Sequence, residues 1–245
     1  MADEAVLRVF RGDSEKGETV DYKVPVEEGM VVLDALHYIQ ANFDGDLAVR
    51  WNCKAAKCGS CSTEINGMPK LSCKTRMDSL SHDEPITVYP IKAFPVIKDL
   101  VTDVKWNFQK HKEIPPFTPP EGEEELTMYQ EDVERSQEFR KCIECFMCQN
   151  VCHILRDNNA KDAFFGPRYM IKIAELDMHP LDTVDRSELL KEEAGVAYCN
   201  ITKCCTEVCP ESIHITDNAI IPLKERVVDK YFDPINWILS KFKEG

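Results

Sequence analysis

The run CNITKCCTEVCP, residues 199–210, repeats the cysteine pattern of an earlier run, CIECFMCQNVC at residues 142–152, with one change. The cysteines of the earlier run follow one another at intervals of three, three and four residues. The same intervals counted from Cys199 end at Cys205 and Cys209, but the second position in the series is Thr202. A spare cysteine, Cys204, stands two residues further on. The repeat therefore predicts a pair of metal sites, one of which lacks a thiolate ligand.

The spacing also indicates which cysteines share a site. In bacterial two-cluster ferredoxins the fourth cysteine of each run binds the cluster of the other run. Applied here, this rule predicts one complete 4Fe-4S site, whose ligands are Cys142, Cys145, Cys148 and Cys209. The second site receives three thiolates, from Cys152, Cys199 and Cys205. Because the hydroxyl of Thr202 is a poor iron ligand, we predict a 3Fe-4S cluster at this second site.

Cys204 leaves two interpretations open. It is either a weakly hydrophobic side chain that binds nothing, as unpaired cysteines commonly are, or the fourth ligand of the second cluster. We favour the first interpretation, because Cys204 is adjacent to Cys205 and the two side chains cannot easily face one edge of a cluster.

A third group of cysteines lies in the N-terminal half of the chain. Cys53, Cys58 and Cys61 have the spacing C-x4-C-x2-C, and Cys73 follows at a distance. This is the plant-type 2Fe-2S pattern. Its loop, CKAAKCGSC, is rich in small residues, which let backbone amides reach the sulfides. Structural zinc is the less favoured alternative, because zinc sites with four thiolates normally contain two close cysteine pairs rather than one.

Net charge and composition narrow the classes of partner. The chain has 245 residues and a net charge of -13 at pH 7, so nucleic acid and anionic membrane surfaces would repel it. Its first residues lack the basic and apolar segments of a secretory leader, and no apolar run reaches the roughly 20 residues of a spanning helix. We therefore expect a soluble, intracellular protein in which the clustered cysteines are metal ligands or redox groups rather than disulfides.

The N-terminal half has the pattern of a small sheet with one helix laid across it. Apolar and polar residues alternate over 20–26 and again over 47–51, which predicts two strands, and the run PITVYPI at 85–91 predicts another. Helical spacing over 31–43 predicts the helix. The pair Asn66-Gly67 predicts a hairpin turn, because both residues tolerate a positive φ.

Beyond the proline-rich stretch 95–120, which contains a predicted domain boundary, the pattern becomes helical. Thr127 and Gln130 have the spacing of a capping box, and Pro167 is placed to open a helix. The apolar stripes that follow are core residues in the simplest interpretation. The alternative is that the last of them contact a partner subunit, through Ile235, Trp237, Ile238 and Phe242.

The cysteine motifs, in this order, resemble those of the iron-sulfur subunits of succinate dehydrogenase and fumarate reductase over nearly the whole chain. The resemblance rests on WNCKAAKCGSCSTEINGMPKLSC (51–73), FPVIKDLVTD (94–103) and the two C-terminal runs. It implies an α+β fold in two domains. Residues 1–103 would form a plant-type-ferredoxin-like β-grasp domain with the 2Fe-2S cluster, and residues 104–245 an all-α helical ferredoxin domain with the 4Fe-4S and 3Fe-4S clusters.

The resemblance further implies electron transfer without any catalytic side chain in this chain. In that family, which includes respiratory complex II of the tricarboxylic acid cycle, electrons from succinate leave FAD on a flavoprotein subunit. They pass through the 2Fe-2S, 4Fe-4S and 3Fe-4S clusters to a membrane quinone. The implied partners are the FAD-containing flavoprotein subunit and a transmembrane anchor with haem b, which would hold the chain at the cytoplasmic side of the cell membrane. The ligand roles carry over to Cys53, Cys58, Cys61 and Cys73 (2Fe-2S), to Cys142, Cys145, Cys148 and Cys209 (4Fe-4S), and to Cys152, Cys199 and Cys205 (3Fe-4S).

The chain departs from well-known members where the quinone binds. His153 follows Cys152, and Asn200 follows Cys199, so no quinone ligand carries over. This version of the C-terminal run resembles a separate branch of the family, for which menaquinone is the expected quinone. His153 is either a structural histidine, which we favour, or a residue that approaches the quinone.

Three other functions remain as alternatives. The first is fumarate reduction by the same parts working in the reverse direction. The second is a free-standing ferredoxin-like electron carrier that serves another dehydrogenase. The third, from a different class, is an interaction module stapled by zinc.

Overall fold

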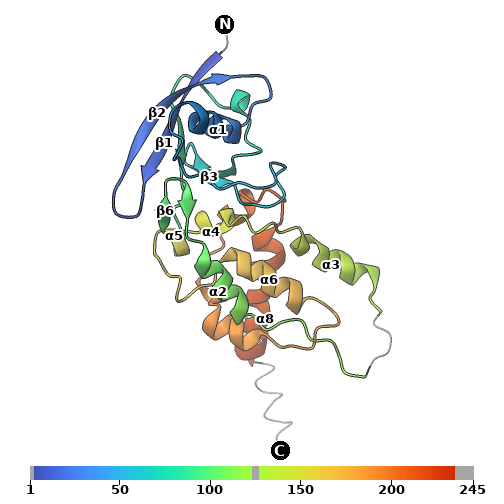
Figure 1. The fold of residues 1–245 in the computed structure, drawn as a ribbon. Coiled ribbons are helices and arrows are strands. Elements are labelled where there is room, and N and C mark those ends of the chain that lie inside the picture. Colours follow the sequence, from blue (N-terminus) through green and yellow to red (C-terminus); the bar gives the residue numbers. More distant parts are fainter. Residues whose placement is uncertain (1–2, 123–126, 235–245) are drawn as a thin grey trace, which may run out of the picture. The chain divides into compact units, whose positions relative to one another are not determined.

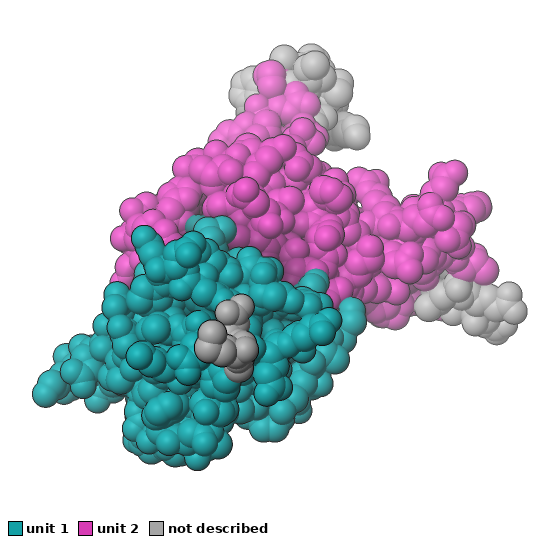
Figure 2. Space-filling model, turned by 90° about the horizontal axis from the view of Figure 1, so that it is seen from above, with its two compact units in different colours: residues 1–106, 143–151 teal, residues 107–142, 152–245 magenta. Residues whose placement is uncertain are grey.

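The computed structural model describes residues 3–122 and 127–234 (Figure 1). The chain divides into two compact units, coloured separately in Figure 2. Unit 1 comprises Met1–Trp106 and Ile143–Val151, and unit 2 comprises Asn107–Cys142 and Cys152–Gly245. The C-terminal residues Ile235, Trp237, Ile238 and Phe242 lie outside the described residues, so their contact with a core or with a partner subunit stays a prediction.

Unit 1 is built on a five-stranded sheet with the strand order β2-β1-β5-β3-β4. Strand β1 (Asp3–Gly12) pairs with β2 (Gly17–Val26) in antiparallel fashion and with β5 (Ile86–Tyr89) in parallel. Strands β2 and β5 confirm two of the predicted strands, whereas β1 carries no prediction from the sequence. The predicted closing strand therefore lies in the middle of the sheet, between β1 and β3.

Helix α1 (Val32–Asn42) lies on one face of this sheet (Figure 1), as its apolar spacing predicts. Its apolar positions are buried together with the inward-facing residues of β1, β2 and β5. Leu7 and Val9 in β1 and Leu36 and Ile39 in α1 are fully buried. Burial of one Leu or Ile side chain contributes about 1.5–3 kcal/mol, so this shared core is the main stabilising feature of unit 1.

The remaining strands of unit 1 form two hairpins. Strand β3 (Ser62–Ile65) pairs with β4 (Met68–Leu71) in antiparallel register. Asn66 and Gly67 connect them with φ angles of 50° and 78°, which confirms the predicted turn. A separate two-stranded sheet consists of β6 (Val96–Lys98) and β7 (Val101–Thr102).

The strand predicted over residues 47–51 is wrong. This segment has no strand pairing; its backbone groups bond instead to side chains and to an irregular segment. The amide of Ala48 donates to Oδ2 of Asp99 at 2.8 Å, and its carbonyl accepts from the amide of Leu100 at 3.2 Å. The alternating pattern therefore reflects one buried and one exposed side of an extended loop.

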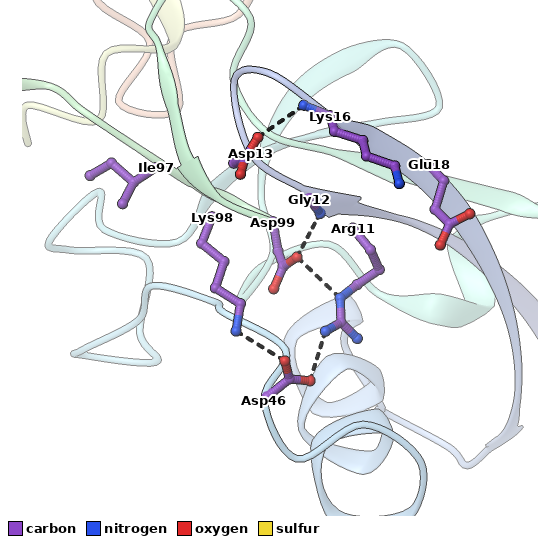
Figure 3. A pocket seen from close by; sticks show the side chains of 10 residues that line it. Arg11, Gly12, Asp13, Lys16, Glu18, Asp46, Ile97, Lys98 and Asp99 are labelled. Atoms are coloured by element: carbon purple, nitrogen blue, oxygen red, sulfur yellow. Dashed lines mark hydrogen bonds and ion pairs between the residues drawn. The ribbon is translucent and has the colours of Figure 1, made fainter.

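Asp99 also organises a cluster of charges within unit 1 (Figure 3). It is 1% exposed and accepts hydrogen bonds from the amide of Gly12 at 2.9 Å and from Nε of Arg11 at 3.1 Å. Arg11 pairs in addition with Asp46, which also binds Lys98. These contacts tie the segment after β6 to the end of β1, beside an open cavity of about 440 Å³.

All regular secondary structure among the described residues of unit 2 is helical. They are α2 (Lys105–Glu113, which begins in unit 1), α3 (Gln130–Arg140), α5 (His153–Arg156), α6 (Pro167–Asp177), η2 (Leu189–Glu193), η3 (Val196–Tyr198), α7 (Cys204–Glu207), η4 (Ile215–Ile220) and α8 (Ile221–Tyr231). Pro167 is the first residue of α6, as predicted. The predicted capping box is wrong: α3 begins at Gln130 itself, with Tyr129 as its N-cap.

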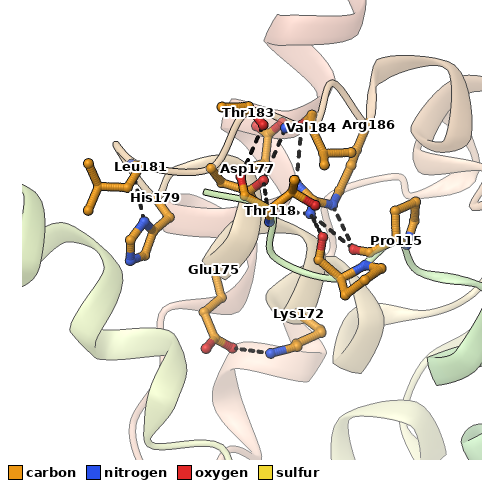
Figure 4. Close-up of polar contacts among 12 residues, drawn as sticks. Pro115, Thr118, Lys172, Glu175, Asp177, His179, Leu181, Thr183, Val184 and Arg186 are labelled. Atoms are coloured by element: carbon orange, nitrogen blue, oxygen red, sulfur yellow. Dashed lines mark hydrogen bonds and ion pairs between the residues drawn. The ribbon is translucent and has the colours of Figure 1, made fainter. Parts of the chain in front are cut away.

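A buried arginine fixes the proline-rich segment within unit 2 (Figure 4). The side chain of Arg186 is fully buried and pairs with Asp182 at 2.8 Å. Its guanidinium also donates to the carbonyls of Pro115, Pro116 and Val184 at 2.9–3.2 Å. Because a buried charge is tolerated only when it is paired and hydrogen-bonded, these acceptors explain how Arg186 fits inside the unit.

Candidate metal centres

The N-terminal cysteine loop is shaped by left-handed backbone conformations. Lys54 and Ala56 have φ angles of 54° and 55°. This curl directs the amides of Ala55 and Lys57 at Sγ of Cys53, with an N···S distance of 3.3 Å in both cases. Hydrogen bonds to sulfur are one of the means by which a protein tunes an iron-sulfur cluster, so this loop fits such a group.

The four predicted 2Fe-2S ligands interact with one another in the structure. Burial, together with the neighbouring thiols of Cys73 and Cys58, raises the pKa of the Cys61 thiol to about 12. The pKa of the Cys58 thiol shifts in the other direction. Burial alone would raise it, but hydrogen bonds from Ser60 and Cys53 outweigh burial and lower this pKa to about 7. The structure therefore brings Cys53, Cys58, Cys61 and Cys73 into one group. A metal that binds there must displace the protons of the thiols.

The two C-terminal cysteine runs adopt the same local conformation. At the second and fourth residues after the first cysteine of each run, the backbone is left-handed. The φ angles are 54° and 59° at Glu144 and Phe146, and 63° at both Ile201 and Lys203. Each run then enters a one-turn helix, α4 (Met147–Asn150) in the first run and α7 in the second.

This shared conformation fixes the alignment of the two runs. Thr202 occupies the backbone position that Cys145 has in the first run, between the two left-handed residues. Cys204 occupies the position of Met147, at the start of the one-turn helix. The structure thus supports the register on which the predicted loss of one ligand depends.

The three predicted 3Fe-4S ligands line one cavity in unit 2. Cys152, Cys199 and Cys205 surround it together with Thr202 and Cys204. Burial, together with the neighbouring thiols of Cys204 and Cys199, raises the pKa of the Cys152 and Cys205 thiols to about 11. A cavity lined by thiols from two separate runs has the donor set of an iron-sulfur site.

Cys204 faces the same cavity, and its Sγ lies 3.3 Å from Oγ1 of Thr202. The hydroxyl that replaces a ligand and the spare thiol therefore contact each other. Cys204 lies beside the predicted cluster under either of its two interpretations, and its role stays a prediction.

The predicted 4Fe-4S ligands belong to both units. Cys145 and Cys148 are buried and lie in unit 1, whereas Cys142 and Cys209 lie in unit 2. Sγ of Cys209 accepts a hydrogen bond from the amide of Ile213 at 3.5 Å. The assignment of these four cysteines to one cluster stays a prediction.

Three features are absent from residues 3–122 and 127–234. None of the twelve cysteines, all of which lie in these ranges, forms a disulfide. No three His, Cys, Asp or Glu side chains converge on the position of a single metal ion. No helix in these ranges has the length and apolar character needed to cross a bilayer.

Other residues beside the C-terminal cavity have no signal in the sequence. Oγ1 of Thr216 lies 3.4 Å from Sγ of Cys205, and Nζ of Lys224 donates to the carbonyl of Cys199. Both residues come after the last cysteine, at distances that no ligand motif specifies. Only the folding of η4 and α8 against the cysteine runs places them there.

A sheet unit with a plant-type cysteine loop and a helical unit with paired cysteine runs together define a class of protein. It is an iron-sulfur protein built from a ferredoxin-like domain and a helical dicluster domain. Two family models agree with this class. A 2Fe-2S iron-sulfur cluster binding domain matches residues 6–109, and a 4Fe-4S dicluster domain matches residues 138–213.

Comparison with individual known proteins narrows the class further. A chain of the Mycobacterium smegmatis Sdh1 complex in the apo form is 62% identical, with a TM-score of 0.93 over 96% of this chain and 100% of that chain. The succinate dehydrogenase iron-sulfur subunit of Bacillus subtilis is 30% identical over 88% of this chain and 90% of its own length. A polypeptide of the fumarate reductase (CoM/CoB) of Methanothermobacter marburgensis is 31% identical over 91% of this chain, which spans 44% of that polypeptide.

The chain belongs to the family of the iron-sulfur subunits of succinate dehydrogenase and fumarate reductase. Membership confirms the predicted α+β fold, with an N-terminal 2Fe-2S domain of the β-grasp type and a C-terminal helical dicluster domain. The domain limits predicted at residues 103 and 104 stay a prediction, as do the individual ligands.

Proposed function

We propose that this chain is the electron-transferring iron-sulfur subunit of a succinate dehydrogenase, a succinate:quinone oxidoreductase. It would pass electrons from FAD of a flavoprotein subunit through 2Fe-2S, 4Fe-4S and 3Fe-4S clusters to a membrane quinone. The observation that carries this proposal is the 62% identity to a chain of the Sdh1 complex over nearly the full length of both chains. The cavity lined by Cys152, Cys199 and Cys205 supports the third cluster.

In this proposal the chain's own residues hold and insulate the clusters. A bound cluster supplies a site that gains or loses one electron at a time. The amides of Ala55 and Lys57 would stabilise negative charge at Cys53, and the buried side chains of Cys152 and Cys205 would shield one side of the third site from water. No side chain is required as an acid, base or nucleophile.

The two ends of such a path require partner subunits. A flavoprotein would supply electrons, and a membrane anchor with haem b would hold the chain at the cytoplasmic face of the cell membrane and present menaquinone. Nε2 of His153 is 2.8 Å from Nδ2 of Asn200, and both residues line the cavity that contains Cys152, Cys199 and Cys205. This contact supports a structural role for His153, because a ring nitrogen held by Asn200 is less available to a quinone.

The reverse reaction, fumarate reduction, is the second candidate. It is favoured by the 31% identity to fumarate reductase subunits, including that of Mycobacterium tuberculosis over 87% of this chain. Both directions use the same cysteines, and the direction depends on the potentials of the clusters and of the quinone. Midpoint potentials measured on the intact complex, with the extracted quinone identified, decide between them.

Affinity purification of the tagged chain from solubilised membranes of its own organism tests the proposal. We expect a flavoprotein and a membrane anchor to be recovered with it, and succinate to bleach the visible absorbance of the clusters. Recovery of the chain alone, with clusters, would support a free-standing carrier. A colourless protein with zinc and no acid-labile sulfide would support the zinc module instead.

A further inference from the structure

Within unit 1 the N-terminal cysteine loop touches the first C-terminal run at one glycine. Gly59 follows Cys58 directly and is buried, with a φ of 68°. A Cβ atom built at this residue would lie 2.6 Å from Cα of Cys145 and 2.8 Å from its Cβ and its N. Real Cβ atoms do not approach other atoms so closely, so the backbones at Gly59 and Cys145 are already in van der Waals contact.

Buried hydrogen bonds fasten the segment that contains Cys145 to the sheet of unit 1. Asn150, at the end of α4, is fully buried. Its Oδ1 accepts from the amide of Ala93 at 3.0 Å, and its Nδ2 donates to Oε1 of Glu64 at 2.8 Å. Glu64 is 1% exposed and also pairs with Nζ of Lys92 at 2.9 Å. Because unsatisfied buried polar groups are costly, these contacts resist any movement of the segment away from the sheet.

We infer that Gly59 is a positioning residue that sets the separation between the 2Fe-2S site and the site to which Cys145 belongs. The inference rests on the proposed function, in which electrons pass between these two sites. The step transfers one electron, so that the first site is oxidised as the second is reduced, and no bond forms or breaks. Transfer becomes steeply slower with distance, and a residue that permits backbone contact beside a ligand of each site shortens the distance.

The absence of a side chain at Gly59 therefore has two separable consequences. One is conformational, since a positive φ favours glycine at any position. The other is steric, since only hydrogen fits between Gly59 and Cys145. Gly67 in the β3–β4 turn has a φ of 78° but no atom within 4 Å of a built Cβ. Alanine at Gly67 has the conformational strain without the collision, so it is a matched control.

The variants G59A, G67A and N150L are compared in the intact, purified complex. Iron and acid-labile sulfide are measured first, so that each variant is examined with its clusters in place. With both centres reduced by dithionite, the microwave power that half-saturates the 2Fe-2S EPR signal reports the magnetic coupling between the two sites. Succinate-dependent reduction of quinone is followed in parallel.

We expect G59A to lose part of the relaxation enhancement of the 2Fe-2S signal and to reduce quinone more slowly, with unchanged iron content. N150L, which removes both hydrogen bonds of Asn150 at similar volume, is expected to shift the coupling in the same direction. G67A should match the wild type in both measurements. Coupling in G59A equal to that of G67A overturns the inference, and where G59A does not assemble, wild-type coupling in N150L overturns it. A wild-type protein without a 2Fe-2S signal would instead contradict the proposed function.

Discussion

Replacement of Thr202 by cysteine should convert the third site from a 3Fe-4S to a 4Fe-4S cluster. The new thiol would stand at the backbone position that Cys145 has in the first run, next to the cavity that Cys152, Cys199 and Cys205 line. Iron should rise by about one atom, from about nine to about ten per chain, because one vacant corner of the cluster gains a ligand. Acid-labile sulfide should stay at about ten per chain, because both cluster types contain four sulfides. Sulfide is thus an internal standard for occupancy.

The same substitution removes the contact between Oγ1 of Thr202 and Sγ of Cys204. A neutral hydrogen bond contributes about 0.5–1.5 kcal/mol, and this one is solvent-exposed, so its loss should leave the fold intact. Metal analysis and EPR of the oxidised complex are the measurements, with T202S as the control that keeps the hydroxyl and adds no thiol. T202C should abolish the 3Fe-4S signal, whereas T202S should retain it. About ten iron atoms in the wild type, or nine in T202C with its signal unchanged, would refute the reasoning.

Three further predictions concern stability and redox tuning. R186M should destabilise unit 2 by about 3–5 kcal/mol in denaturant unfolding, because it leaves the buried carboxylate of Asp182 unpaired. K224M should lower the midpoint potential of the third site by roughly tens of millivolts, because it removes a cation that binds the carbonyl of Cys199. In that titration K203M, whose charge is already paired with a carboxylate, is the control and should cause a smaller shift. Removal of the clusters by acid or a chelator should lower the thermal midpoint of the isolated complex, since metal binding to cysteines contributes folding free energy.

The elements that the sequence predicts correctly have signals confined to a few neighbouring residues. The hairpin at Asn66 and Gly67, the start of α6 at Pro167 and the apolar spacing of α1 are of this kind. The wrong predictions arise where contacts with a segment distant in the sequence determine the local backbone conformation. Residues 47–51 alternate like a strand, but the amide of Ala48 bonds to the Asp99 side chain and its carbonyl to the amide of Leu100, rather than to a neighbouring strand. Strand β1 gives too weak a pattern by itself and is defined by pairing on both of its sides.

The residues of the candidate sites also divide into those with a local sequence signal and those placed by distant segments. Cysteine spacing predicts the groups of ligands, because each loop carries most of its ligands within a few residues and its backbone path brings them together. The surrounding contacts are not predictable from spacing. Asn150 reaches Glu64, and Gly59 reaches Cys145, only because β3 and the first C-terminal run pack together in unit 1. Such pairs are far apart in the sequence, and neither partner belongs to a ligand motif that would point to the other.

The two C-terminal runs show that backbone path and ligand identity are specified separately. Both have the same pair of left-handed residues before a one-turn helix, although the residue between them is Cys145 in one run and Thr202 in the other. Ile201 holds a φ of 63°, which for a β-branched residue is a strained conformation that costs about 1–3 kcal/mol. Strain of this size persists only where other interactions determine the backbone, and bonds from Cys199 and Cys205 to a cluster would be such interactions. The two runs share this backbone path with Cys145 or Thr202 at the same position, so a single side chain would set the number of irons without altering the fold.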